Sequence, residues 1–436
     1  MKIRFIHARI VSMCDKFPQV IEDGELHTEN DRITYVGDVL TTEEASAKTC
    51  WDREIDCQGD VLMPGFKDAH THSPMTFLRS FADDLPLDEW LHKQVFPAEA
   101  KLTPEDIYHL SKVALLEYIS GGITANFDMY AHFLPNAQAS IDLGFRTVFC
   151  GSVNDFTGSV PLMEEEYEQF NSMNDLISYQ LGFHAEYTTS PQLIKDIAKL
   201  ADKKKAPVYM HCSETAREVA QCQQRYGLTP PAYLAEEGIF EHGGGGFHFV
   251  HMTEDDLRLC GEKQIFAITC PASNLKLASG IAPLTEMMQY NIPLAIGTDG
   301  PASNNCLDMF REMFLATALQ KYICKDASAM PAGKVLYMAT TGSALAMHLS
   351  DCDVLDAGKK ADIIRLDLRQ PNMQPVNDIV KNIVYSGSKS NVAMTMINGN
   401  ILYENGEFKL KESCDKIYAT ANEITRRIHG GKVHTM

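Results

Sequence analysis

Two histidines one residue apart, His70 and His72, lie in the stretch MPGFKDAHTHSP, where an apolar run gives way to small and polar residues. In an extended strand, residues i and i+2 project from the same face, so the two imidazole rings would converge on one point. Converging imidazoles are typical ligands of zinc and of ferrous iron. Two surface histidines near a loop would show the same spacing, so the rest of the sequence has to decide between these interpretations.

Chemically active residues recur at the ends of the later strand-like runs. They are Asp128, His184, His211 with Glu214, His248 with His251, and Asp299. Histidines scattered over a surface have no reason to fall repeatedly at strand ends. If the strands are parallel and form a barrel, their carboxyl ends line one mouth, and these side chains gather there.

His70, His72, His211 and Asp299 would together offer three nitrogens and one carboxylate to a divalent cation. Such a cation lowers the pKa of bound water toward neutrality and so supplies a hydroxide nucleophile. Taken singly, His211 could be a core histidine and Asp299 could cap a helix. As a set at one barrel mouth, the four residues favour a metal site.

Glu214 follows His211 by three residues and could move a proton from the activated water to a substrate nitrogen. Alone, it would be an ordinary charge near a helix N-terminus. Strand alternation does not choose between His248 and His251, and it leaves the role of His184 equally open.

Other motifs narrow the chemistry. The run YQLGFHAEYTT contains no lysine, which in two-metal barrels often bridges the ions after carboxylation, so one metal ion is predicted. HExxH, GxSxG and an HxE paired with PCxxC are absent from the sequence. The glycine run in HGGGGFHF lacks the GxGxxG spacing and is predicted to be a flexible turn before a strand.

The elements that must position these residues alternate along the middle of the chain. Eight apolar runs are separated by helical stretches: VLMPGFKDAHTH, GITANFDMY, FRTVFCGSV, YQLGFHAEY, PVYMHCSE, GFHFVHM, IFAITCPAS and PLAIGTDG. Continuous apolar runs with intervening helices indicate a buried parallel sheet. An open doubly wound sheet would show the same alternation, but eight strands favour an α/β fold of the (β/α)8 type.

Both ends of the chain are predicted to be β-rich. KIRFIHARIV, RITYVGDV, ADIIRLDL and VAMTMINGNILYENGEF have strand character, with hairpin turns at Asn398-Gly399 and Asn405-Gly406. A last helix carries Ile417, Ala421, Ile424 and Ile428 at helical spacing. We therefore expect a small β-sandwich domain built from residues 1–62 and 355–436, and a TIM-like catalytic barrel over residues 63–354.

Composition excludes several classes of protein. A net charge of −19 argues against binding nucleic acid or an anionic membrane surface. No apolar stretch approaches the length of a membrane span, and the N-terminus lacks the features of a signal peptide. The 12 cysteines include no CxxC pair, which indicates reduced thiols and a cytoplasmic protein. The expected partner is then a small-molecule substrate. The composition does not decide whether the chain also forms a homo-oligomer.

The sequence resembles the amidohydrolase superfamily, in its aminohydrolase branch that includes S-adenosylhomocysteine and 5′-methylthioadenosine deaminases. The likeness covers nearly the whole chain. It is most specific in PGFKDAHTHSPMTFLRSFADDLPLDEWL, FPAE, HCSET, PASNLKLASGIAPL and GTDGPASNN, and GKKADIIRLDL resembles the return to the small β domain.

The resemblance implies one divalent metal ion per chain, zinc with ferrous iron as the alternative, held by His70, His72, His211 and Asp299. It implies that Glu214 moves protons to the ring nitrogen under attack. His248, rather than His251, would orient the water and stabilise the tetrahedral intermediate together with Asp299. Residues implied to contact or surround the substrate are Glu99 near the ribose hydroxyls, Trp90 in the pocket wall and His184.

The implied reaction is hydrolytic deamination of an adenosine-type nucleoside with release of ammonia. The run FRTVFCGSVNDFTGSVPLMEEE lacks the arginines that relatives offer to the homocysteine carboxylate. Without a bidentate cation, an amino-acid tail gains little, so 5′-methylthioadenosine, adenosine or 5′-deoxyadenosine are favoured over S-adenosylhomocysteine. A second departure is Thr269-Cys270, where relatives usually show His-Asn.

Three alternatives stay open at this point. One is deamination of another aminated purine, a pterin or a triazine-like heterocycle. The second is hydrolysis of a cyclic amide on the same scaffold. The third is a catalytically inactive barrel that serves as a binding protein, although such a scaffold would need none of the site residues.

Overall fold

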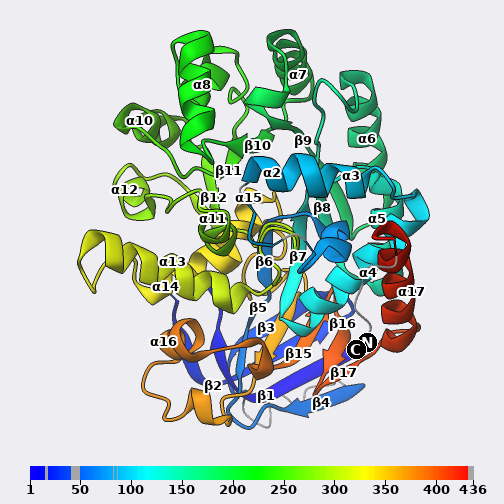
Figure 1. The fold of residues 1–436 in the computed structure, drawn as a ribbon. Coiled ribbons are helices and arrows are strands. Elements are labelled where there is room, and N and C mark those ends of the chain that lie inside the picture. The colour runs from blue at the N-terminus through cyan, green and yellow to red at the C-terminus, as the bar shows by residue number, and fades with distance from the viewer. Residues whose placement is uncertain (15–17, 41–49, 82, 86, 431–436) are drawn as a thin grey trace.

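The structure is a computed structural model that describes residues 1–14, 18–40, 50–81, 83–85 and 87–430. It contains a parallel eight-stranded barrel and a separate mixed sheet built from both ends of the chain (Figure 1). The predicted fold class is thereby confirmed. Of the predicted composite domain, residues 15–17, 41–49 and 431–436 lie outside the described residues, and the domain boundaries stay predictions.

Each of the eight predicted apolar runs contains one barrel strand, and the first run, VLMPGFKDAHTH, also contains strand β5 of the mixed sheet. Their bounds are β6 Phe66–Thr71, β7 Ile123–Asp128, β8 Arg146–Cys150, β9 Ile177–Ala185, β10 Val208–Cys212, β11 Gly244–His248, β12 Phe266–Thr269 and β13 Leu294–Ile296. Neighbours in the order β13-β12-β11-β10-β9-β8-β7-β6 are hydrogen bonded. Just beyond β13, the Asp299 N–H donates to the His70 carbonyl oxygen of β6 at 2.8 Å. This bond draws the first and last strands together at their carboxyl ends.

Helices follow the strands and cover the barrel. The longer ones are α4 Pro104–Ser120, α5 Phe133–Leu143, α6 Val160–Met173, α7 Pro191–Lys204, α8 Ala216–Tyr226, α9 Pro230–Glu236, α10 Glu254–Lys263 and α13 Met309–Cys324. The shorter ones are α2 Leu87–Trp90, α3 Phe96–Glu99, α11 Pro271–Lys276, α12 Leu284–Gln289, α14 Ala332–Tyr337, α15 Ser343–Ala346 and α16 Ile379–Lys381. Single 3-10 or π turns are η1 Ser73–Leu78, η2 Leu91–Val95, η3 Glu186–Thr188, η4 Met338–Gly342, η5 Pro371–Met373, η6 Asn382–Ser386 and η7 Lys389–Asn391.

Three of the longer helices begin with a reciprocal capping box, in which the N-cap threonine and an acid three residues later satisfy each other's backbone N–H groups. The pairs are Thr103 with Asp106 in α4, Thr215 with Glu218 in α8, and Thr253 with Asp256 in α10. Two of these helices, α8 and α10, follow the strands that end in His211-Cys212 and His248.

The separate sheet joins segments that precede and follow the barrel in the sequence. Its order is β17-β16-β15-β14-β5-β1-β2-β3, with β4 on β1. The bounds are β1 Lys2–Val11, β2 Val20–Glu29, β3 Arg32–Asp38, β4 Arg53–Asp56, β5 Val61–Pro64, β14 Ile363–Leu366, β15 Val392–Ile397, β16 Asn400–Glu404 and β17 Glu407–Phe408. The two predicted hairpin turns connect β15 to β16 and β16 to β17, with positive φ at Asn398-Gly399 and Asn405-Gly406.

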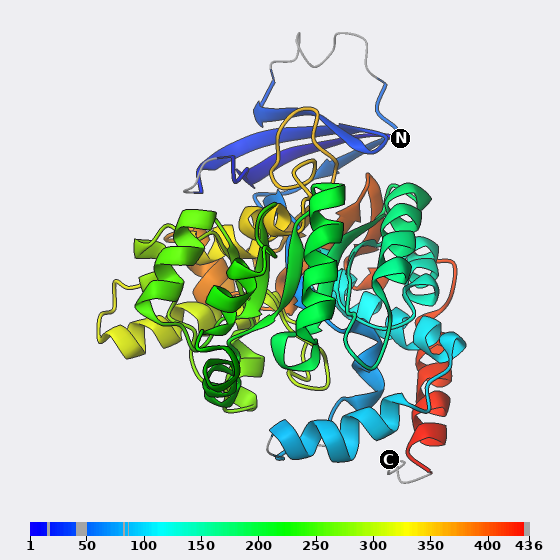
Figure 2. The ribbon, with the colours of Figure 1, turned by 90° about the horizontal axis from the view of Figure 1, so that it is seen from above.

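The last helix, α17 Cys414–Ile428, packs against the barrel helix α4 (Figure 1). Its buried residues are the predicted Ile417, Ala421, Ile424 and Ile428. The α2–α3 segment extends from the barrel on the side away from β1–β3 (Figure 2). Within the described part of the chain, no helix has the length and apolar character needed to span a bilayer.

The prediction of a flexible turn at the glycine run is wrong, because Gly244, Gly245 and Gly246 belong to strand β11. A Cβ on Gly245 would lie 2.7 Å from the Phe266 carbonyl oxygen, and one on Gly246 would lie 2.5 Å from the ring of Phe249. These glycines therefore allow a close approach of neighbouring chain segments inside the sheet.

Candidate active site

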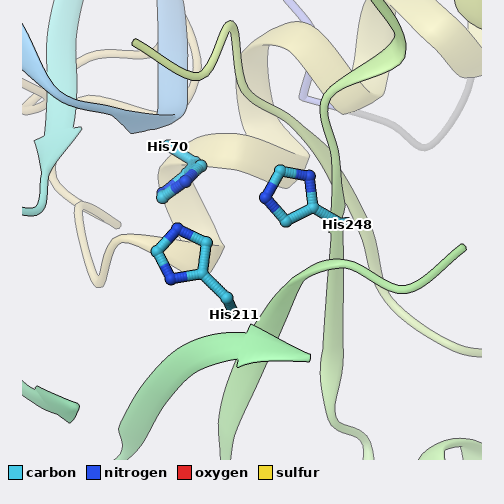
Figure 3. A group of neighbouring side chains, drawn as sticks. All are labelled: His70, His211 and His248. Atoms are coloured by element: carbon cyan, nitrogen blue, oxygen red, sulfur yellow. The ribbon is translucent and has the colours of Figure 1, made fainter. Parts of the chain in front are cut away.

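Three histidines from different strands face one another at the barrel mouth (Figure 3). His70 lies near the end of β6, His211 on β10 and His248 at the end of β11. The ring centroid of His70 lies 4.9 Å from that of His211 and 5.6 Å from that of His248. One ring nitrogen from each histidine lies within 4.8 Å of the others.

A second group overlaps the first at His70. His70, His72 and Asp299 also bring one ligand atom each within 4.8 Å of one another. The Asp299 Oδ1 atom lies 3.2 Å from His72 Nε2 and 3.6 Å from His70 Nε2. The structure thus brings together all four residues predicted to bind a metal, since the ring of His211 also stacks at 5.6 Å from that of His72.

The hydrogen-bond partners of these histidines leave their ligand atoms available. His211 Nδ1–H donates to the His184 carbonyl oxygen at 2.8 Å, and His72 Nδ1–H donates to that of Met129. Because a carbonyl only accepts, each ring carries a proton on Nδ1 and directs its Nε2 atom toward the cluster. Among the residues described, neither buried ring nitrogen of His70 has a hydrogen-bond partner. This donor set of imidazoles and a carboxylate fits a divalent transition metal.

The electrostatics of the site favour positive charge at its centre. Burial holds the pKa of His70 and of His211 well below the ordinary value, so both imidazoles are neutral. Burial raises the pKa of Asp299, but the hydrogen bond and charge of His72 outweigh it and hold that pKa well below its usual range. Burial likewise lowers the pKa of His72, and Asp299 outweighs it to raise that pKa to about 9. His70, His211 and Asp299 thus have the protonation states of metal ligands, whereas His72 is protonated beside Asp299 and would lose its Nε2 proton on binding a metal ion.

Glu214 lies beside this cluster, between His248 and the loop after α11 that contains Ser279. Its Oε2 atom lies 3.8 Å from His248 Nε2, and its Oε1 atom accepts from Ser279 Oγ at 3.3 Å. His248 Nδ1 pairs with Asn274 Oδ1 at 2.8 Å, which directs Nε2 toward the cluster. His251 instead bonds the Ser279 carbonyl oxygen through Nε2. Of the two candidate histidines, His248 is therefore the one that faces Glu214.

Glu99 and His184 also lie close to the cluster. Glu99 Oε1 accepts from the Tyr130 hydroxyl at 2.6 Å. Burial raises the pKa of Glu99, while Tyr130 and His72 act in the opposite direction. The ring of His184 lies 5.0 Å from that of His211, and its Nδ1 atom pairs with Thr188 Oγ1 at 2.9 Å.

Trp90 and Asp128 are placed differently. Trp90 is buried in an apolar cluster with Phe77 and Val95, and its contact with a substrate stays a prediction. Asp128 accepts from the Ser73 N–H at 3.1 Å and from Asn136 Nδ2 at 2.9 Å. It therefore fixes the turn that follows His72.

The arginine within the FRTVFCGSV run points away from this mouth. Arg146 is the first residue of β8, at the opposite end of the strand from the site, and forms two hydrogen bonds with Asp362 at 2.8 and 3.0 Å. The run that was predicted to lack a carboxylate-binding arginine thus contains one that is already paired.

Several residues at the site were not singled out from the sequence. Tyr130 binds Glu99, Asn274 binds His248, and Ser273 Oγ donates to Asp299 Oδ2 at 2.5 Å. Ser273 and Asn274 lie in the PASNLKLASGIAPL segment, which carried the resemblance without assigning either residue a role. Tyr130 follows strand β7 by two residues, and Ser273 and Asn274 lie in α11 after strand β12, so their nearness to strand ends was the only available signal.

Comparison with known proteins identifies the class to which this barrel and its mouth belong. The amidohydrolase family model matches residues 61–402, and the chain belongs to the amidohydrolase family. It is 39% identical over 420 residues to a 5-methylthioadenosine/S-adenosylhomocysteine deaminase from Moorella thermoacetica, covering 94% of this chain and 96% of the relative. A protein of the same name from Pelotomaculum thermopropionicum is 37% identical over 414 residues, covering 94% and 95%.

Solved structures agree with this assignment. An adenosine deaminase from Xanthomonas campestris with bound zinc superposes with a TM-score of 0.92 at 32% identity, covering 98% of both chains. An atrazine chlorohydrolase from Arthrobacter aurescens, complexed with zinc, superposes with a TM-score of 0.88 at 21% identity, covering 97% of this chain and 100% of the other. At that lower identity, the likeness shows the shared fold alone.

Proposed function

We propose that this chain is a metal-dependent hydrolytic deaminase of adenosine-type nucleosides. The observation that carries the proposal is the position of Glu214, 3.8 Å from His248 and beside three further imidazoles and one carboxylate at the barrel mouth. The names of the relatives, 5-methylthioadenosine/S-adenosylhomocysteine deaminase and adenosine deaminase, support the same reaction class.

His70, His72, His211 and Asp299 would hold one divalent ion per chain, zinc in the first instance and ferrous iron as the alternative. The neutral state of His70 and His211 and the two Nδ1 bonds to carbonyl oxygens support this assignment. When bound, such an ion lowers the pKa of a water molecule and so supplies a nucleophile at neutral pH.

The residues around the proposed ion would handle protons. Glu214 takes a proton from the attacking water and delivers it to the ring nitrogen next to the carbon under attack. His248, oriented by Asn274 at 2.8 Å, holds Nε2 toward the attacking oxygen. Asp299, held by a hydrogen bond from Ser273 Oγ at 2.5 Å, would take the second proton of the same oxygen and pass it to the departing amine, which leaves as ammonia.

The proposed substrate is a nucleoside with an uncharged 5′ group. Glu99 would accept from the ribose hydroxyls, and His184 would contact the substrate beside it. Arg146 is committed to Asp362, so that run offers no cation to an amino-acid carboxylate at the mouth. We therefore favour 5′-methylthioadenosine, adenosine and 5′-deoxyadenosine over S-adenosylhomocysteine. A cytoplasmic location is consistent with 12 cysteines that include no CxxC pair.

The proposal is tested with the purified protein and a panel of these four nucleosides. We expect ammonia release and a one-unit gain in product mass, with turnover highest for the three nucleosides without an amino-acid tail. Hydantoins and chlorotriazines should stay unchanged. Turnover of those compounds without turnover of any nucleoside would overturn the proposal.

The role of Glu214 is tested with Glu214→Gln, which keeps the shape of the side chain and removes its capacity to carry a proton. We expect turnover to fall at least about 100-fold, the usual scale of general acid–base catalysis, while the protein retains about one metal ion per chain. Glu254→Gln, at the exposed start of α10, is the matched control and should behave as the unmodified protein. A Glu214→Gln protein with near-normal turnover would remove this residue from its role.

A further inference from the structure

We propose that Glu218 is a positioning residue that holds the backbone of Glu214 in its working orientation. The inference rests on the proposed function, because it concerns how the proposed proton carrier is held. Glu218 lies on the first turn of α8, four residues after Glu214, and its side chain is directed back beneath the turn that follows β10.

The Glu218 carboxylate accepts from three consecutive backbone N–H groups. Oε1 accepts from Ser213 at 2.8 Å, and Oε2 accepts from Glu214 at 2.8 Å and from Thr215 at 3.5 Å. The residue is 4% exposed, so these bonds are shielded from water. Burial and the charge of Glu214 raise the pKa of Glu218 to about 7, and the three N–H donors oppose that shift because their bonds favour the charged carboxylate.

The capping boxes of helices α4 and α10 show what an α-helix start alone requires. In α4, Asp106 accepts from the backbone N–H of its N-cap residue Thr103 at 2.7 Å, and in α10, Asp256 accepts from that of Thr253 at 2.9 Å. Both are completed by an aspartate. At α8 the acid is a glutamate, and its best bonds reach Ser213 and Glu214, upstream of the N-cap. The additional methylene thus serves the turn that carries Glu214 rather than the helix cap.

This turn has a backbone that needs support. Ser213 has φ of 52°, a left-handed conformation that a residue other than glycine adopts at a cost. Its carbonyl oxygen accepts from Val250 N–H at 3.0 Å and from His251 N–H at 2.9 Å. The peptide that Glu218 holds is therefore also tied to the turn after His248. The Glu218 carboxylate thereby fixes the position of Glu214 relative to His248, which faces it across the barrel mouth.

Two substitutions separate the two tasks of Glu218. Glu218→Asp converts this capping box into the type found at α4 and α10, so the helix start is retained while the bonds to Ser213 and Glu214 are lost. Thr215→Ala removes the other half of the box, the bond from the Glu218 N–H at 3.1 Å, and leaves the carboxylate in place. The second variant is the matched control for loss of the cap.

We expect Glu218→Asp to unfold within a few degrees of the unmodified protein, to bind the same amount of metal and to lose kcat about 10- to 100-fold with KM little changed. Displacement of a reacting group by about 1 Å has an effect of this size. Thr215→Ala should unfold at a lower temperature and keep kcat within about twofold. Unchanged kcat in Glu218→Asp, or equal loss of kcat in both variants, would overturn the positioning role.

A double-mutant cycle identifies the residue through which Glu218 acts. In a Glu214→Gln background, Glu218→Asp should lower kcat no further, because the group that it positions no longer carries a proton. Losses that multiply would show that Glu218 acts on something else and would refute the proposal. If Glu214→Gln alone kept full turnover, the assigned role of Glu214 would fail instead, which distinguishes the two failures.

Discussion

Each histidine of the candidate centre is oriented by a contact outside the centre. His72 and His211 donate to backbone carbonyl oxygens, and His248 pairs with the amide of Asn274. His70 stacks on the ring of Phe247, with centroids 3.8 Å apart. The hydrogen bonds place a proton on Nδ1 of His72 and His211, and all four contacts fix the direction of their rings before any ligand arrives. One ring nitrogen of each histidine therefore lies toward one region without help from a bound ion.

Glu99 provides a prediction about substrate selection. Glu99→Ala should raise KM for adenosine and 5′-methylthioadenosine about 10- to 100-fold, the effect of losing hydrogen bonds to a charged group, and should leave any turnover of free adenine unchanged. Steady-state kinetics on nucleoside and free base measure both effects. Tyr130→Phe, which removes only the hydroxyl that binds Glu99, should give a smaller loss. Equal losses for nucleoside and free base would exclude a ribose contact.

Residue type and position at a strand end were enough to predict four metal ligands, His70, His72, His211 and Asp299. The structure brings these four residues together. The same reasoning did not separate His248 from His251, because the chain turns sharply after β11 and strand alternation ends there. Tyr130, Asn274 and Glu218 were not predicted. Their partners lie on other loops or depend on backbone geometry, which neither spacing nor composition encodes.

The elements were predictable where burial dictates composition. Strands β8 and β10 are buried along their whole length, and their sequences, RTVFC and VYMHC, are mostly apolar. Strands β6 and β7 are equally buried but carry several polar residues, so only the apolar residues before and between these marked them. Strand β11 breaks this pattern, because three of its five residues are glycines with no hydrophobic signature. Close approach of neighbouring backbones replaces side-chain packing there, and a pattern based on side chains does not detect it.

The close approach at β11 is testable by adding a single methyl group. Gly245→Ala should lower stability by about 1 to 3 kcal/mol or more, because the new Cβ meets the Phe266 carbonyl oxygen at 2.7 Å, and backbone cannot move aside as a flexible side chain does. Gly243→Ala is the control, since no atom lies within 4 Å of its added Cβ and only its φ of 82° is strained. Thermal unfolding compares the two. If Gly243→Ala lost more stability than Gly245→Ala, close packing of Gly245 against Phe266 would not be the reason for the glycine.

At the scale of the whole molecule, a buried ion pair links the barrel to the mixed sheet. Arg146 begins barrel strand β8, and Asp362 immediately precedes strand β14 of the mixed sheet. Asp362 also accepts from the backbone N–H of Asn398 at 2.8 Å. Burial raises the pKa of Asp362, but Arg146 outweighs it and holds that pKa below its ordinary value. The pair is therefore charged at neutral pH.

Asp362→Asn should lower the free energy of unfolding by about 3 to 5 kcal/mol at pH 7, because it leaves the Arg146 charge buried without its partner. The lowered pKa gives the direction with pH: this stabilisation is complete above the ordinary pKa of an aspartate and is lost as pH falls through the lower folded value. The difference between the two proteins should thus shrink in acid. Urea unfolding at several pH values measures it.

Asp351→Asn is a matched control for this pair. Asp351 binds Arg32 at 2.7 Å, but its side chain is 57% exposed, and an exposed pair contributes at most about 1 kcal/mol. If Asp362→Asn lowered the free energy of unfolding no more than Asp351→Asn does, the buried Arg146–Asp362 pair would not be what links the barrel to the mixed sheet.

The antiparallel pairing of β5 with β14 also has a consequence for how the chain is made. β5 comes before the first barrel strand and β14 after the last one, so this pair forms only when the whole barrel sequence lies between them. During synthesis, β5 must wait with one edge unpaired while eight further strands leave the ribosome. Pairings between such distant segments form slowly, and exposed strand edges attract other chains. For this protein, the rate of translation and the presence of holdase chaperones should therefore influence yield more than the final stability does.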